Sequence, residues 1–228
     1  YRNNSQSRAL EDSLRRERIP YHIVAGIKFY DRKEVKDMLC YMRVVVNPKD
    51  SLAFSRIINT PARGIGATSL RKLEDQAVQL NVSLYELVER VVENPSEYRH
   101  VGLSAKVMSS LGGLVGLIQE VQALENGPEP LPSYSYEKLL HESGYLEALK
   151  ADSSHEGAAR LENLQELSTA LKQYESNQEV PGLTGFLETI TLDSEAEVDH
   201  SETVAMMTAH GSKGLEYEHV FVTGAEEN

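Results

Sequence analysis

Residues Val204 to Gly224 read VAMMTAHGSKGLEYEHVFVTG, and this stretch decides the fold predicted for the chain. Two short apolar runs, 204–207 and 220–222, are rich in β-branched or bulky residues, which is typical of buried strands rather than helices. Between them lie polar residues punctuated by Gly211 and Gly214. They are Thr208, His210, Ser212, Lys213 and Glu216. Because open α/β sheets bind ligands at the carboxyl ends of their strands, the stretch predicts a strand, a ligand-facing loop with a helix start, and a second strand.

Length and composition set broader limits. The chain has 228 residues with 40% hydrophobic content, enough for one large or two small domains. No apolar run approaches the roughly 18 residues that cross a bilayer, and the first residues lack the apolar core of a signal peptide. We therefore expect a soluble, cytoplasmic protein. The single cysteine, Cys40, excludes disulfides, and the seven histidines form no His-x-x-x-His pair that would indicate zinc.

The net charge of −12 argues against a nucleic-acid partner, since phosphate binding usually requires a basic surface. The acidic residues are concentrated in a few segments, however, notably residues 193–199. Helix amino termini can also hold phosphate through backbone amides, without charged side chains. Net charge alone is therefore a poor guide to the partner of this chain.

The beginning of the chain predicts half of an α/β repeat. Residues 1–8, YRNNSQSR, lead into a helix with apolar positions at Ala9, Leu10 and Leu14, and residues 21–26 form a strand pattern that Gly26 closes. A second helix carries an apolar stripe, which Asn47 and Pro48 end. The stripe consists of Val35, Met38, Leu39, Met42, Val45 and Val46.

From Ser51 to about Asp199 the pattern predicts helices and no convincing strand. The first feature is a Gly-Ile-Gly turn at residues 64–66 before a helix start, as in a helix-hairpin-helix element. Its glycines permit positive φ and close backbone approach, so amides at the next helix start could grip a phosphate without reading sequence. A plain helix-turn-helix packing unit is the alternative reading. Further along, Ser83 and Glu86 have the spacing of a capping box.

Several blocks together resemble the UvrD, PcrA and Rep family of superfamily 1 DNA helicases. Residues 208–217 match motif V of that family, and residues 1–8 match its motif IV. The motif V matches are Thr208, His210, Lys213, Gly214, Leu215 and Glu216, with Tyr217 in the aromatic place; the motif IV matches are Tyr1, Arg2, Asn4, Gln6, Ser7 and Arg8. Further matching blocks are residues 29–37, 60–66 and 160–167. We expect Glu34 and Lys36 to lie on a solvated face, and Arg160, Glu162 and Asn163 to join helices.

The resemblance implies roles for individual residues. Arg2 would contact the γ-phosphate of ATP as a catalytic arginine finger, which suits a guanidinium that is always charged. Gly214 and Glu216 would bind the nucleotide, with Glu216 on the ribose. Thr208 and His210 would face the single strand, while Gln6 and Lys213 would couple DNA to nucleotide. The hairpin residues would touch duplex DNA, namely Thr60, Arg63, Gly64, Ile65 and Gly66.

The fold class implied by the resemblance is a partial α/β RecA-like domain, the second motor domain 2A, interrupted by an all-helical insertion domain 2B. Residues 1–50 and 200–228 would form the motor part, and residues 51–199 the insertion. The parent would be an ATP-dependent 3′ to 5′ DNA helicase of repair or replication, using ATP and Mg²⁺ with its first motor domain. The 228 residues contain no Walker A loop, and motif VI is expected after Asn228, so we expect no activity from this portion alone.

Two alternatives remain open from the residues. The helical portion could be an autonomous DNA- or protein-docking module without an ATPase role. A nuclease-linked relative of the AddA or RecB kind is the other, although the Thr-Pro-x-Arg-Gly-Ile-Gly block of residues 60–66 favours the shorter motors.

Overall fold

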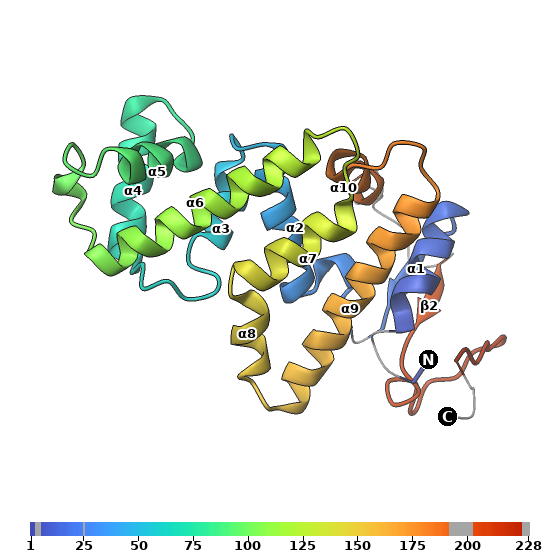
Figure 1. Ribbon diagram of the computed structural model, residues 1–228. Helices are drawn as coiled ribbons and strands as arrows, with labels where there is room; N and C mark the ends of the chain where they lie inside the picture. The colour runs from blue at the N-terminus through green and yellow to red at the C-terminus, as the bar shows by residue number, and fades with distance from the viewer. Residues whose placement is uncertain (3–5, 25, 192–202, 225–228) are drawn as a thin grey trace.

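The computed structural model describes residues 1–2, 6–24, 26–191 and 203–224, and in this part the protein is mostly helical with one small sheet (Figure 1). The helices are α1 (Ser7–Arg16), α2 (Lys33–Val46), α3 (Ser51–Ile57), α4 (Ala67–Leu80), α5 (Leu84–Glu93), α6 (Ala105–Glu125), α7 (Pro132–Glu142), α8 (Tyr145–Lys150), α9 (His155–Ser176) and α10 (Leu183–Thr191). Two 3-10 turns, η2 (Phe29–Asp31) and η3 (Arg99–Val101), and the strands β1 (Tyr21–Ile23) and β2 (Val204–Met206) complete the described elements.

The sheet joins the two ends of the chain. Strands β1 and β2 pair in parallel, with Tyr21 opposite Val204 and Ile23 opposite Met206. The pairing extends at both ends, because Val204 N donates to Pro20 O and Val24 N donates to Met206 O, each at 2.9 Å. Parallel neighbours require a long crossover, and here the helices from α2 to α10 lie between them in the sequence. The two segments assigned to the motor part thus contribute to one sheet, and the prediction that the chain between them is helical is confirmed for the described residues.

Two predictions about the last segment are wrong. Residues 220–222 form no strand, and within the described part of the chain they make no backbone hydrogen bond of the kind a sheet requires. Val220, Phe221 and Val222 are exposed, so their apolar pattern has no neighbouring strand to bury it. The expected helix start in the loop is also missing, because residues 209–214 form consecutive turns. Asn4, the acidic residues 193–199 and the junction near 199–200 lie outside the described residues.

Helices α2 to α10 pack around one core, and we call them the helical body. Helix α2 lies at its centre. Its residues Val35, Met38 and Met42 are fully buried, whereas Val46, at the end of the predicted stripe, is exposed. The helix packs against α3, α6, α7, α9 and α10, and one hydrophobic core runs from Phe29 to Phe186. The core is thus continuous across residue 50, and the predicted domain division there stays a prediction.

Helix α6 is the one described helix long and apolar enough to cross a membrane by length and composition. It packs against α2, α5 and α7, and buries a row of apolar side chains in the core. These are Val107, Leu111, Leu114, Val115, Leu117, Ile118 and Val121. This packing is that of a core helix.

Side chains cap several helix starts. Asp50 accepts from Ala53 N at 2.9 Å, and so begins α3 directly after the Asn47-Pro48 break. The capping box of α5 is confirmed, since Glu86 N donates to Ser83 Oγ at 3.1 Å and Ser83 N donates to Glu86 Oε2 at 2.8 Å. Each cap satisfies amides that the helix itself leaves unpaired.

Glu34 corrects one expectation, because it is 4% exposed rather than solvated. Its carboxylate accepts a hydrogen bond from Asn163 Nδ2, and Arg32 Nη1 donates to Asn163 Oδ1 at 2.6 Å. Asn163 therefore joins α9 to α2, as expected. Lys36 is exposed and pairs with Asp31, while Arg160 pairs with Glu156 of its own helix.

Candidate functional site

The first residues lie beside the end of β2. The backbone nitrogen of Tyr1 donates to Met207 O at 3.1 Å, and Ala209 N donates to Tyr1 O at 2.8 Å. Segments separated by about 200 residues therefore meet directly after the strand, at the carboxyl end of the sheet (Figure 1). Burial, and then the carboxylate of Glu11, raise the pKa of the Tyr1 phenol above its ordinary value.

Gln6 connects three parts of this end. Its Oε1 accepts from the backbone nitrogen of Arg2 at 2.9 Å, and it stands at the amino cap of α1. The residue also faces Gly224, where a Cβ atom would come within 2.9 Å of Gln6 Nε2. Gly224 has φ +66°, so both its backbone and the space beside it favour glycine. Arg2 itself is exposed.

The loop after β2 is a chain of turns that presents its functional candidates to solvent. Thr208 Oγ1 accepts from Gly211 N at 3.0 Å, and Ser212 N donates to Thr208 O at 3.1 Å. Lys213 N donates to His210 O at 3.3 Å, after which Gly214 turns the backbone with φ +82°. His210, Lys213, Gly214 and Glu216 are all exposed, whereas Thr208 is half-buried.

The structure thus brings Arg2, Gln6 and Thr208 to one end of the sheet and places Glu216 farther along the same loop. No hydrogen bond or ion pair among the described residues joins Arg2 to Glu216. An exposed guanidinium beside this loop offers a positive charge to an anionic ligand. Within that same described part, no group of three His, Cys, Asp or Glu residues could hold a metal ion.

Arg63 in the hairpin has a different environment from the one predicted for a DNA contact. Its Nη1 donates to Ile57 O at 2.8 Å, and its Nη2 donates to the Tyr41 hydroxyl at 2.6 Å and to Ser143 O at 3.2 Å. The guanidinium therefore ties the hairpin to α2 and to the end of α7. The half-buried Thr60 takes part through its carbonyl, which accepts from the Tyr41 hydroxyl at 2.7 Å.

The three residues after Arg63 divide between core and surface. Ile65 is 4% exposed and belongs to the hydrophobic core. Gly64 and Gly66 are exposed on either side of it. Gly64 has φ +78°, and Gly66 caps α4, whose first turn contains no acidic residue. The backbone of the hairpin is therefore open to a ligand, while the side chains of Arg63 and Ile65 serve the fold.

Two residues near the hairpin were not predicted from the sequence to have a role. Asn59 Oδ1 accepts from Arg63 N at 2.7 Å and from Ile65 N at 3.3 Å, and so shapes the turn from within. Lys106, at the start of α6, is exposed and lines a hollow of about 340 Å³ together with Gly64. An asparagine just before a Thr-Pro turn gave some signal of a loop contact, whereas Lys106 is 42 positions from Gly64 and gave none.

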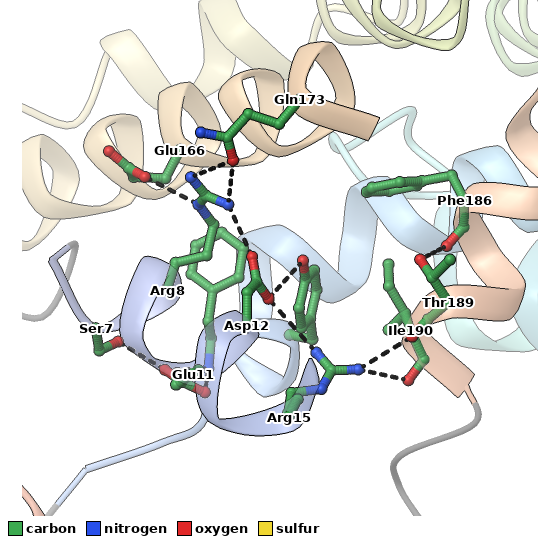
Figure 2. Close-up of polar contacts among 12 residues, drawn as sticks. Ser7, Arg8, Glu11, Asp12, Arg15, Glu166, Gln173, Phe186, Thr189 and Ile190 are labelled. Carbon is green, nitrogen blue, oxygen red and sulfur yellow. Dashed lines mark hydrogen bonds and ion pairs between the residues drawn. The ribbon is translucent and has the colours of Figure 1, made fainter. Parts of the chain in front are cut away.

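A third polar cluster joins α1 to α9 and α10 (Figure 2). Arg8 Nε pairs with Glu166 at 3.0 Å and Arg8 Nη1 with Asp12 at 2.8 Å, while both terminal nitrogens donate to Gln173 Oε1 at 3.3 Å. Arg15 Nη2 donates to the carbonyls of Thr189 and Ile190 at 3.3 and 3.1 Å. Burial raises the pKa of Asp12 although the neighbouring Arg8 opposes the shift.

Comparison with known proteins gives a consistent family. The whole chain, residues 1–228, matches the UvrD-like helicase C-terminal domain. An ATP-dependent DNA helicase PcrA of Staphylococcus epidermidis is 40% identical over 237 residues, covering 100% of this chain and 30% of that relative. An ATP-dependent DNA helicase PcrA of Staphylococcus aureus is 37% identical over 234 residues, with the same two shares. The chain therefore spans about a third of the length of these relatives.

Proposed function

The chain belongs to the UvrD-like helicase C-terminal domain family, and from this premise we propose that it is one part of an ATP-dependent DNA helicase. The parent couples ATP hydrolysis to 3′ to 5′ movement along single-stranded DNA and to duplex unwinding, in repair or replication in the cytoplasm. Residues 1–50 and 200–228 belong to a second RecA-like motor domain, and residues 51–199 are an all-helical insertion in it. The observation that carries the proposal is the parallel pairing of β1 with β2, together with the hydrogen bonds that hold Tyr1 beside Met207 and Ala209.

In this proposal the end of the sheet faces the nucleotide. Arg2 supplies a positive charge to the phosphates, and Gly214 and Glu216 hold the nucleoside part. Thr208 and His210 contact the single strand, while Gln6 and Lys213 couple the two ligands. The exposed positions of Arg2, His210, Lys213 and Glu216 support this assignment, because each can reach a ligand that the first motor domain presents. Mg²⁺, which neutralises charge on the phosphates when bound, would be held by that first domain.

The hairpin of residues 60–66 is proposed to contact duplex DNA through its backbone. Gly64 and Gly66 are exposed, and α4 begins at Gly66 with no acidic residue in its first turn. Amides at such a helix start bind phosphate without sequence preference. Lys106 adds a cation beside Gly64.

The test is made in the parent protein that contains the first motor domain. Arg2→Ala is expected to lower DNA-stimulated ATP turnover by at least about tenfold, because it removes a charge-stabilising group from a phosphoryl-transfer site. Glu216→Ala is also expected to lower turnover, because the ribose loses its hydrogen-bond acceptor. Glu218→Ala, exposed two residues beyond Glu216, is the matched control and is expected to keep full turnover. Unchanged turnover in both Arg2→Ala and Glu216→Ala would contradict the proposed role of this end of the sheet.

A docking module is the second candidate, favoured by the continuous core that the helical body has of its own from Phe29 to Phe186. The variant Gly66→Val, in the exposed hairpin, tests whether such a docking module binds duplex DNA. Reduced duplex binding by this portion alone would support a docking surface for DNA, whereas unchanged binding would remove it.

A further inference from the structure

The buried face of α1 is entirely polar. The residues of this helix that are buried are Ser7, Arg8 and Glu11, and no α1 residue belongs to the hydrophobic core of the described structure. The helix is therefore held against the helical body by directional hydrogen bonds and ion pairs. Apolar packing tolerates small rotations because it is non-directional, whereas such bonds lose their strength when donor and acceptor are misaligned. The orientation of α1 on the body is fixed by these polar contacts.

Arg8 is the centre of this junction. Its side chain is 4% exposed. It contacts Asp12 on α1, and Glu166 and Gln173 on α9. A guanidinium presents donors in a fixed planar fork, so this set of acceptors defines one relative position of α1 and α9. Because the charge is buried, moving α9 away from it leaves a charge without its full set of partners, which is costly.

Arg15 makes the second attachment, about two turns further along α1. It donates to the last carbonyls of α10, at Thr189 and Ile190, and its guanidinium lies 5.0 Å from the centre of the Tyr30 ring. Cations near a helix carboxyl end are stabilised by the exposed carbonyls there. Figure 2 shows the two arginines reaching from α1 toward different helices of the body.

The same helix begins at the proposed nucleotide-facing end. Gln6, which accepts from the Arg2 backbone, precedes Arg8 by two residues, so a displacement at Arg2 and Gln6 moves Arg8 with it. We propose that Arg8 and Arg15 are positioning residues that transmit movement of the sheet end to the helical body. Arg8 acts on Glu166 and Gln173 of α9, which we call its receivers, and Arg15 acts on the carbonyls of Thr189 and Ile190 in α10. The inference rests on the proposed helicase function. It assigns to α1 the coupling of ATP turnover to unwinding at the distant hairpin.

The test keeps α1 intact and changes the receivers in the parent protein. Glu166→Gln with Gln173→Leu removes the charge and the amide acceptor that Arg8 uses on α9. We expect unwinding per ATP hydrolysed to fall about tenfold, within the range of measured couplings between sites, while single-strand-stimulated ATP turnover stays within about twofold. Glu166→Asp, which retains a carboxylate, is expected to restore part of the coupling.

The matched control is Glu156→Gln on the same helix. Glu156 is exposed and pairs only within α9, with Arg160, so its loss removes an ion pair without touching the junction. We expect the control to unwind as the unaltered protein does. An equal loss of unwinding in Glu156→Gln, or a proportional loss of ATP turnover and unwinding in the double variant, would overturn the proposal.

A distance measurement decides the matter independently of activity. Spin labels at Ile19 and Val78, which are 42% and 79% exposed, report the position of the segment between α1 and β1 relative to α4. The receiver variant is expected to shift or broaden the label distance without nucleotide, and the control to leave it unchanged. An unchanged distance would overturn the positioning role. Failure of the unaltered parent to hydrolyse ATP or unwind DNA would instead remove the proposed function, and the distances would still test the junction.

Discussion

The guanidinium of Arg63 donates to the hydroxyl of Tyr41 at 2.6 Å, and that hydroxyl donates in turn to the carbonyl of Thr60 at 2.7 Å. This relay fixes the hairpin on α2, because Arg63 also donates to carbonyls of Ile57 and Ser143. A residue that its sequence context assigns to DNA is thus an internal brace of the loop whose backbone faces outward.

Arg63→Ala is expected to destabilise the fold by about 2–3 kcal/mol, because several carbonyls and the Tyr41 hydroxyl lose a charged donor. Tyr41→Phe removes one link and should cost only about 1 kcal/mol. Urea unfolding of the two variants measures the difference. Equal stability of Arg63→Ala and the unaltered protein, with a loss of duplex binding alone, would return Arg63 to the role of a direct DNA contact.

Replacement of the two hairpin glycines by alanine is expected to change the stability of the fold by different amounts. Gly64 has φ +78°, so Gly64→Ala is expected to cost about 1–2 kcal/mol from backbone strain, although the nearest atom, Val107 Cγ2, is at an ordinary 3.7 Å. Gly66 has φ −73° and nothing within 4 Å of a Cβ atom, so Gly66→Ala introduces no strain or clash and should cost less than about 1 kcal/mol, as alanine does at a helix amino cap.

The affinity for duplex DNA is a second property to measure on the hairpin variant Gly66→Ala. Gly66→Ala is expected to weaken binding although the fold is unaltered, because the methyl group stands where a phosphate would approach the α4 amides. Equal binding by Gly66→Ala and the unaltered protein would show that the duplex does not approach this helix start.

The sequence predicted the elements better than it predicted the faces they bury. Helical spacing and a capping box located α2 and α5, and the apolar run at Val204 located β2. In α1, however, spacing drew attention to Ala9, Leu10 and Leu14, whereas the buried residues are Ser7, Arg8 and Glu11. Those polar residues are buried because their partners lie on distant elements, and a local pattern carries no information about partners.

Pairing explains the failed strand as well. Residues 204–206 and 220–222 have similar apolar patterns, but only the first has a neighbour, β1, that satisfies its backbone groups in the described structure. The site residues likewise divide into those set by local sequence and those set by a distant partner. The exposed glycines and loop residues follow from turn chemistry, whereas the internal role of Arg63 depends on a carbonyl at Ser143, 80 residues away.

Asn163 holds two buried charged groups together. It accepts from Arg32 and donates to Glu34, which are 7% and 4% exposed. Asn163→Leu is expected to destabilise the fold by about 2–4 kcal/mol, since it leaves both groups buried with fewer partners. Gln165→Leu, at an exposed position of the same helix, is the control and should change stability by no more than about 0.5 kcal/mol. Thermal unfolding compares them, and similar melting temperatures for the two variants would refute the assignment.

The capping box of α5 makes stability depend on pH. The hydrogen bond from Ser83 N holds the pKa of the Glu86 carboxyl below its ordinary value of 4.5. In acid the unfolded chain therefore binds more protons at this group than the folded chain does, so stability rises with pH there. The contribution is complete above pH 4.5 and is lost as pH falls through the lower pKa of the folded state.

Two variants separate the cap from its charge. Ser83→Ala removes the acceptor for Glu86 N and should cost about 1 kcal/mol at neutral pH, or about 2–4 °C in melting temperature for a protein of this size. Glu86→Gln keeps an oxygen that can accept from Ser83 N but does not titrate. The stability difference between the unaltered protein and Glu86→Gln should therefore shrink as pH falls below 4.5. A difference that stays constant across that range of pH would show that the Glu86 charge contributes nothing to the start of α5.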